Sequence, residues 1–207
     1  FTKSLEKFPP HMLFERQLLG HLSRNEGDYT GALLQLPESL SKMLVHGYQS
    51  LIFNKVLDMR IKEGIDACLP QIGDYVMPAD GYGGPDQRVT IEVTERNQSK
   101  LSKRCREGKA WVAGLLPGAN SNFSKGRQGE LEKEVMNDFR IKFKDFIIDD
   151  IPELSSYGMY RPLFQKYNDI KVDFDSDGPV FTFWLHKGTY ATSFLREIMK
   201  SSDVTVY

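Results

Sequence analysis

The sequence predicts an α+β fold. Apolar residues recur at helical spacing through the first quarter of the chain, and short β-like runs separated by turn residues follow after Gly64. Near the end of the chain, a strand-like run stops at a glycine and restarts at once as a helix. With 207 residues, of which 40% are hydrophobic, the chain can bury one large core or two smaller ones.

The first quarter of the chain is predicted to be helical. Residues 9–24 begin with two prolines and continue with leucines at helical spacing. Pro37 is placed to open a longer helix, which Gly64 can end. We expect this longer helix to be buried and central, because apolar side chains cover most of its circumference: Leu40, Met43, Leu44, Tyr48, Leu51, Ile52, Val56 and Leu57.

Short strands and further helices are predicted after Gly64. Residues 74–77, 89–93 and 110–116 have strand character, and the polar segment before the third run could be a helix. Residues 129–139 have the pattern of an amphipathic helix, and residues 170–185 that of a hairpin that turns at Asp-Ser-Asp-Gly. Both faces of the second hairpin strand are apolar, so we expect that strand to lie inside a sheet.

The run "WLHKGTYATSFLREIMK" (184–200) contains an abrupt joint between a strand and a helix. The unpaired N–H groups and the positive dipole of a helix start attract anions such as phosphate, and Lys187, the backbone of Gly188 to Tyr190 and Arg196 could gather around one. The alternative is that Thr189 caps the helix, Arg196 is a surface charge and Tyr190 belongs to the core. Spacing alone favours this alternative.

A second candidate site is a local excess of basic residues against the single acid Glu107. Such an excess suits a polyanion, whose binding is dominated by phosphate contacts. A charge run is more often a solvated helix face, and no aromatic residue is interleaved with these bases. The candidate residues are Arg96, Lys100, Lys103, Arg104, Arg106 and Lys109.

Composition and motifs argue against several other classes of function. Lys plus Arg (27) nearly cancels Asp plus Glu (28), so only a local patch could indicate nucleic acid. The two cysteines form no CxxC and the four histidines lack helical metal-pair spacing, so we expect no metal site and a reducing cytoplasm. No apolar run approaches the ~20 residues of a membrane span. The glycine that a Walker A motif requires is missing before Lys125, so the sequence does not support a nucleotide-hydrolysing site. The chain begins at Phe1 rather than at methionine, which suggests a fragment.

Two long motifs in order resemble the TruD family of tRNA pseudouridine synthases, in particular its archaeal members. They are "HGYQSLIFNKVLDMRI" (46–61) and "FWLHKGTYATSFLREIMK" (183–200). Between them "GDYV", "GKAWVAGLLPG", "GRQGELE" and "LSSYGMYR" occur in the expected order, so the resemblance covers nearly the whole chain.

The resemblance implies a two-part architecture. Residues 1–154 would be the TRUD-type insertion domain of helices and short strands, and residues 155–207 would be the C-terminal strands and helix of the catalytic sheet. It further implies an enzyme without metal or organic cofactor that converts uridine, typically uridine-13 of tRNA, into pseudouridine. The implied partner is tRNA and the implied place is the cytoplasm. We expect no membrane association and favour a monomer.

The family's catalytic aspartate has no counterpart in this chain. It lies in a motif close to Gly-x-Lys-Asp-x-x-Ala, whereas the chain's one Lys-Asp pair, Lys144-Asp145, has Lys142 in place of the glycine and Ile148 in place of the alanine. The resemblance therefore implies the second half of the enzyme, which supplies RNA-binding surface and one wall of the pocket. "KGTY" also resembles a segment of the TruB branch, in which an arginine two residues after the tyrosine pairs with the aspartate. Thr192 stands there in this chain, which leaves Lys187 and Arg196 as candidates for that role. The resemblance thus favours the joint as an edge of the active site over the capping alternative, and it implies four pocket-edge candidates: Lys187, Gly188, Tyr190 and Arg196.

Two other classes of function stay open from the sequence. One is a non-catalytic RNA-binding module that uses the basic stretch from Arg96 to Lys109. The other is a structural α+β domain without an RNA role. Residues upstream of Phe1 would separate the enzyme from the binding module, since the enzyme requires a Gly-x-Lys-Asp motif there.

Overall fold

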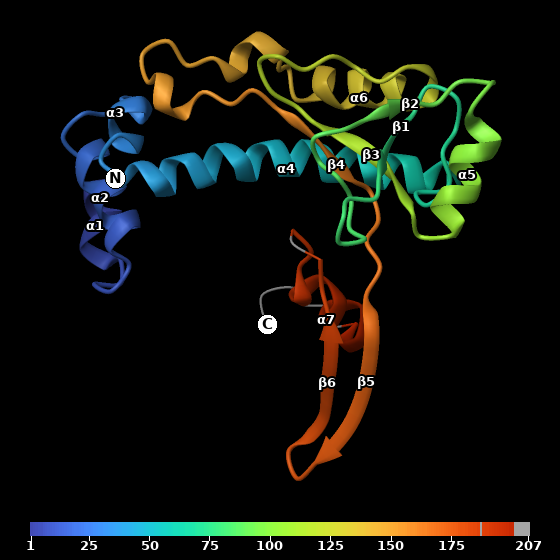
Figure 1. The fold of residues 1–207 in the computed structure, drawn as a ribbon. Helices are drawn as coiled ribbons and strands as arrows, with labels where there is room; N and C mark the ends of the chain where they lie inside the picture. The colour runs from blue at the N-terminus through green and yellow to red at the C-terminus, as the bar shows by residue number, and fades with distance from the viewer. Residues whose placement is uncertain (187, 201–207) are drawn as a thin grey trace. The chain divides into compact units, whose positions relative to one another are not determined.

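A computed structural model describes residues 1–186 and 188–200 (Figure 1). Four helices come first: α1 (Thr2–Lys7), α2 (Leu13–Leu22), α3 (Tyr29–Leu33) and the long α4 (Glu38–Lys62). Strands β1 (Tyr75–Pro78) and β2 (Ile91–Glu92), helix α5 (Gln98–Arg106), strand β3 (Ala110–Leu116) and helix α6 (Gly126–Asp138) follow. The chain continues with β4 (Met159–Pro162), β5 (Asn168–Asp175), β6 (Gly178–Trp184) and α7 (Ala191–Met199). This mixture of helices with antiparallel strands confirms the α+β prediction.

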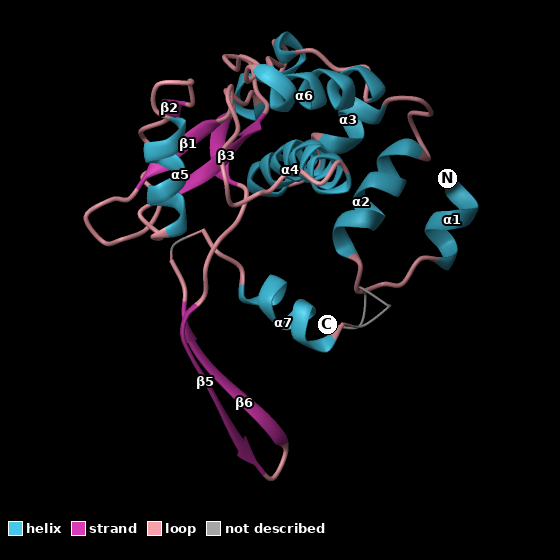
Figure 2. Ribbon diagram, turned by 90° about the vertical axis from the view of Figure 1, so that its right-hand side faces the viewer, coloured by secondary structure: helices cyan, strands magenta, loops and turns pink. Residues whose placement is uncertain are grey.

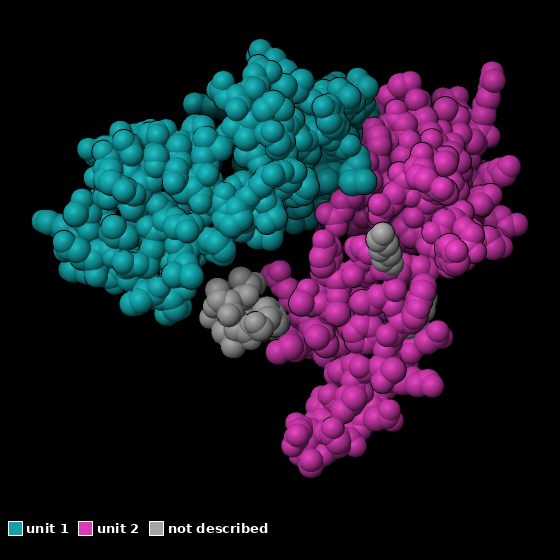
Figure 3. All heavy atoms as spheres, turned by 60° about the vertical axis from the view of Figure 1, so that its left-hand side comes forward, with its two compact units in different colours: residues 1–59, 115–124, 129–159 teal, residues 60–114, 125–128, 160–207 magenta. Residues whose placement is uncertain are grey.

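The chain forms two compact units (Figure 3). Unit 1 comprises residues 1–59, 115–124 and 129–159, and unit 2 comprises residues 60–114, 125–128 and 160–207. Neither unit is a continuous stretch of chain. The predicted boundary between residues 154 and 155 concerns the architecture of a larger enzyme, and it stays a prediction.

The core of unit 2 is built on most of a sheet with the strand order β2-β1-β3-β4, of which residues 115–116 of β3 and Met159 of β4 are assigned to unit 1. Strand β1 is antiparallel to β3, with Val76 opposite Val112, and every residue of β3 is buried. Helix α5 lies beside this sheet (Figure 2). Its Leu101 and Cys105, which are 5% and 6% exposed, belong to the core. A strand buried along its whole length has a continuous apolar sequence, which is why "AWVAGLL" could be recognised.

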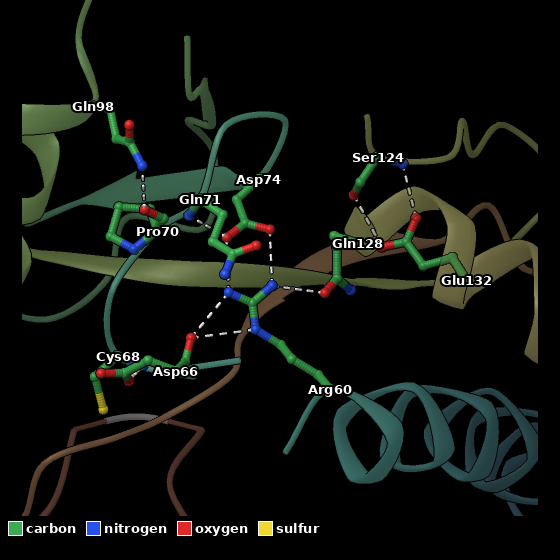
Figure 4. A network of polar contacts seen from close by, with 10 residues as sticks. All are labelled: Arg60, Asp66, Cys68, Pro70, Gln71, Asp74, Gln98, Ser124, Gln128 and Glu132. Atoms are coloured by element: carbon green, nitrogen blue, oxygen red, sulfur yellow. Dashed lines mark hydrogen bonds and ion pairs between the residues drawn. The ribbon is translucent and has the colours of Figure 1, made fainter. Parts of the chain in front are cut away.

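A buried ion pair ties three segments of unit 2 together (Figure 4). Arg60, at the end of α4, donates two hydrogen bonds of 2.8 Å to the carboxylate of Asp74, and both side chains are 1% exposed. Its remaining N–H groups donate to Gln128 Oε1 and to the Asp66 carbonyl oxygen. A buried charge requires such complete pairing, because desolvation would otherwise outweigh the attraction.

Helix α4 has the predicted bounds but not the predicted burial. Gly64 follows it with a φ of +72°, which suits a residue without Cβ. Only one stripe of the helix is buried, including Ile52 and Val56. On other faces four apolar side chains are 38–60% exposed, so the prediction of burial all round is wrong: Met43, Leu44, Tyr48 and Leu51. Packing partners decide which apolar face is covered, and composition does not.

The hairpin β5–β6 also differs from its prediction. It begins at Asn168, two residues before the predicted start, and turns where predicted, with Asp175 opposite Gly178. Among the described residues β6 pairs with β5 alone, so the prediction that it lies inside a sheet is not met. Phe194 of α7 lies 4.7 Å from Phe183, measured between ring centroids, and covers one face. On the other face Val180 and Trp184 are 43% and 49% exposed.

Candidate nucleic-acid interface

Helix α5 presents most of its basic side chains to solvent. The sequence follows the helical period, since Leu101 and Cys105, four residues apart, turn into the core and fix the orientation of the helix. Lys100, Lys103 and Arg106 are therefore exposed, whereas Arg104 is half-buried. Arg96 precedes the helix and Lys109 follows it, and both are exposed.

The acid Glu107 neutralises part of this charge. Its carboxylate lies 2.8 Å from Lys109 Nζ and 4.0 Å from Lys103 Nζ. The hydrogen bond from Lys109 and the charges of Lys109, Lys103 and Arg104 hold the pKa of Glu107 below its usual value. Among the described residues the four other cations form no ion pair: Arg96, Lys100, Arg104 and Arg106. These four are the members of the predicted set best able to bind phosphates.

Two cavities of unit 2 are lined by members of the basic set. Lys100 and Arg104 line a cavity of about 190 Å³, together with Val76, Ile91 and Leu101. Among the residues that the structure describes, no acidic residue lines this cavity. Its walls therefore combine an apolar floor with two cations, a composition that sequence spacing could not reveal because β1, β2 and α5 each contribute to it.

Arg96 lines a second cavity of about 590 Å³, in which the charges balance. Lys125, Glu92 and Glu95 share its wall, so two cations face two carboxylates. Lys125 Nζ lies 3.0 Å from Glu92, and the hydrogen bond to Glu92 raises the pKa of Lys125. Gly73 lies in the same wall with a φ of +94°, and a Cβ there would stand 2.5 Å from the backbone carbon of Lys125. Charge balance makes this cavity less suited to a phosphate than the smaller one.

The strand-to-helix joint leads into α7 without a side-chain cap. Gly188 has a φ of +87°, and Tyr190 is the N-cap residue without a side-chain hydrogen bond. Thr189 is therefore not the cap, which contradicts that alternative. Its Oγ1 is buried and has no hydrogen-bond partner within the described part of the chain. Lys187, the first residue of the predicted cluster, lies outside the described residues.

Tyr190 does not belong to the core. Its side chain is 60% exposed, and its ring centroid lies 6.0 Å from the guanidinium carbon of Arg161. Phe194, one turn later, is half-buried instead, with its ring 4.6 Å from that of Tyr167. Arg196 is exposed, which agrees both with a role in binding an anion and with the alternative of an ordinary surface charge. The grouping of Lys187, Gly188, Tyr190 and Arg196 at a pocket edge stays a prediction.

The carboxylate of Asp145 and the two cysteine thiols, which could in principle take part in chemistry, have structural roles or low reactivity. Asp145 accepts a hydrogen bond from the Lys142 backbone N–H at 2.8 Å, as a capping residue does. Cys68 and Cys105 are free thiols that line one cavity of about 20 Å³. Burial raises the pKa of Cys105 to about 11, so its thiol is neutral at physiological pH.

The described residues contain no group of three or more His, Cys, Asp or Glu side chains that could hold a metal ion. None of their helices is both long and apolar enough to cross a bilayer.

Comparisons with known proteins agree on one family. The family model for tRNA pseudouridine synthase D (TruD) matches residues 1–198. A relative of that name from Methanosarcina acetivorans is 36% identical over 206 residues, which is 97% of this chain and 47% of the relative. One from Thermoplasma volcanium is 37% identical over 199 residues, covering 96% of this chain and 47% of the relative. A crystal structure of TruD from Methanosarcina mazei matches with a TM-score of 0.82 and 34% identity, over 96% of this chain and 47% of that one.

Proposed function

The chain belongs to the tRNA pseudouridine synthase D (TruD) family, and we propose that it forms part of an enzyme that isomerises uridine to pseudouridine in tRNA. The match over residues 1–198 is the observation that carries this proposal. The chain spans about half the length of the relatives it matches. In the proposal the target is uridine-13 of tRNA, and the enzyme acts as a monomer in the cytoplasm.

This chain supplies RNA-binding surface and one wall of the uridine pocket. Isomerisation requires the uridine to leave the RNA stack and to meet an aspartate beside its sugar. The aspartate motif is absent from residues 1–207, so the aspartate must come from another segment. Residues 1–154 are assigned to the insertion domain and residues 155–207 to the catalytic domain.

Two groups of residues perform the binding in this proposal. The unpaired cations of α5 and its flanks contact phosphates, because charge-assisted hydrogen bonds to phosphate are among the stronger polar contacts. At the pocket edge Lys187, Gly188, Tyr190 and Arg196 face the substrate. The first turn of α7, which lacks a side-chain cap, adds backbone N–H groups to that edge.

Measuring binding and catalysis separately tests whether this chain binds RNA while another segment supplies the catalytic aspartate. The purified chain is mixed with a tRNA that carries uridine-13, and both affinity and pseudouridine formation are measured. We expect salt-dependent binding and no pseudouridine above a control without protein. Pseudouridine made by the chain alone would overturn the assignment of catalysis to another segment. A reading frame without Gly-x-Lys-Asp upstream of Phe1 would favour a non-catalytic RNA-binding module.

A further inference from the structure

The cavity of about 190 Å³ beside α5 has a composition that the proposed function does not yet use. It lies under the helix, between α5 and strands β1 and β2, and the buried side chains of Val76 and Leu101 contribute to it. Ile91, on the edge strand β2, is 37% exposed and forms an apolar part of the rim. An apolar hollow that opens beside cations is favourable for a ligand with one apolar and one anionic part.

The two cations of this cavity lie on a single stripe of α5. Lys100 and Arg104 are four residues apart, which places them on the same face one turn from each other. Neither side chain forms an ion pair among the described residues, and the lining contains no carboxylate to repel an anion. A phosphate at this rim would therefore meet uncompensated positive charge.

The volume restricts what can enter. Pockets for drug-sized ligands measure roughly 300–1,000 Å³, so a cavity of about 190 Å³ suits one small ring rather than a large cofactor. Asn97 also lines it, with its Oδ1 bound to the Thr94 N–H and its Nδ2 bound to the Glu92 carbonyl oxygen. Each of these atoms keeps one further hydrogen-bonding position. Asn97 is thus held in place and can still meet the polar edge of a planar ring.

We propose that this cavity receives one unpaired nucleobase of the bound RNA, while Lys100 and Arg104 hold the flanking phosphates. Unstacked bases are typically bound between apolar side chains or on arginine planes, with hydrogen bonds to their edges. The site is separate from the uridine pocket, which needs the missing aspartate, and it anchors a second nucleotide. The inference rests on the proposed function for the identity of the ligand as RNA.

Abasic RNA tests this proposal on the unmodified chain. Fluorescence anisotropy compares a labelled single-stranded uridine decamer with a decamer of the same phosphates and sugars that lacks the bases. We expect the intact decamer to bind about 5- to 10-fold more tightly, because a bound base adds contacts that phosphates cannot supply. The variant Ile91→Thr keeps a β-branched residue in the strand and should remove most of this difference. Val89→Thr is the matched control, since Val89 is 43% exposed and does not line the cavity.

Each outcome decides a separate question. Equal affinity for the two decamers would overturn the base site while leaving RNA binding by phosphate contacts intact. Binding of neither decamer would overturn both the base site and the RNA-binding role of this chain. Competition by free uridine monophosphate at the concentrations at which the decamer binds would show a site for free nucleotides and overturn RNA as the source. A base-dependent difference that Ile91→Thr removes and Val89→Thr retains would support the proposal.

Discussion

Replacing Arg60 should destabilise this protein more than replacing any surface arginine. In the variant Arg60→Met the carboxylate of Asp74 stays 99% buried without its counter-ion, and Gln128 Oε1 loses a donor. Removing one partner of a buried ion pair costs about 3–5 kcal/mol of unfolding free energy. At ~2–4 °C per kcal/mol for a chain of this size, the melting temperature should fall by roughly 6–20 °C.

Urea unfolding followed by far-UV circular dichroism measures this cost. Arg88→Met is the control, because Arg88 pairs with Asp86 at 2.9 Å on the surface and is 85% exposed. We expect the control to leave the unfolding midpoint unchanged. The double variant Arg60→Met/Asp74→Leu should cost less than the sum of its single variants, because it leaves no buried charge unpaired. A loss for Arg60→Met no larger than that for Arg88→Met would refute the reasoning.

Four further predictions concern α5, the joint and the thiols. Lys100→Ala should lower the slope of log affinity against log salt for single-stranded RNA by about 0.7, measured by anisotropy, and an unchanged slope would leave only a solvated helix. In the whole enzyme, Arg196→Ala should slow single-turnover isomerisation or weaken RNA binding by roughly 10- to 100-fold. Tyr190→Ala should leave the melting temperature nearly unchanged because the side chain is 60% exposed, and a large loss would restore the core assignment. Iodoacetamide should label Cys68 before Cys105, and the labelling rate of Cys105 should increase with pH up to about pH 11. Mass spectrometry can follow both labelling rates. Equal labelling rates for the two cysteines at pH 8 would contradict this prediction.

Local patterns predicted most elements of this fold because each signal lies within a few residues. Pro37 and Gly64 enclose α4, and the continuous apolar run of β3 shows that it is buried. Burial of particular faces depends on distant segments, which no local pattern contains. The sequence suggested that Tyr190 is in the core, but Tyr190 is 60% exposed, and Phe194, one turn later on the same apolar stripe, packs against Phe183 of the hairpin.

The basic candidates could be listed from the sequence, but their grouping could not. Glu107 pairs with Lys103 and Lys109, which are close to it in sequence. This pairing makes these two lysines weaker candidates for binding phosphate than the other four basic residues. The cavity that Lys100 and Arg104 share requires β1 and β2 to meet α5, which only the tertiary structure shows. The buried charge of Arg60 was missed for a similar reason, because its partners lie 14 and 68 residues away.

Single-turnover isomerisation by the complete gene product tests the central claim most directly. The enzyme is mixed in excess with a tRNA that carries uridine-13 and with the same tRNA carrying cytidine at that position, and pseudouridine is mapped chemically. The account predicts pseudouridine at position 13 of the first tRNA and none in the second. Absence of pseudouridine from the first tRNA, with a folded protein that binds it, would contradict the account.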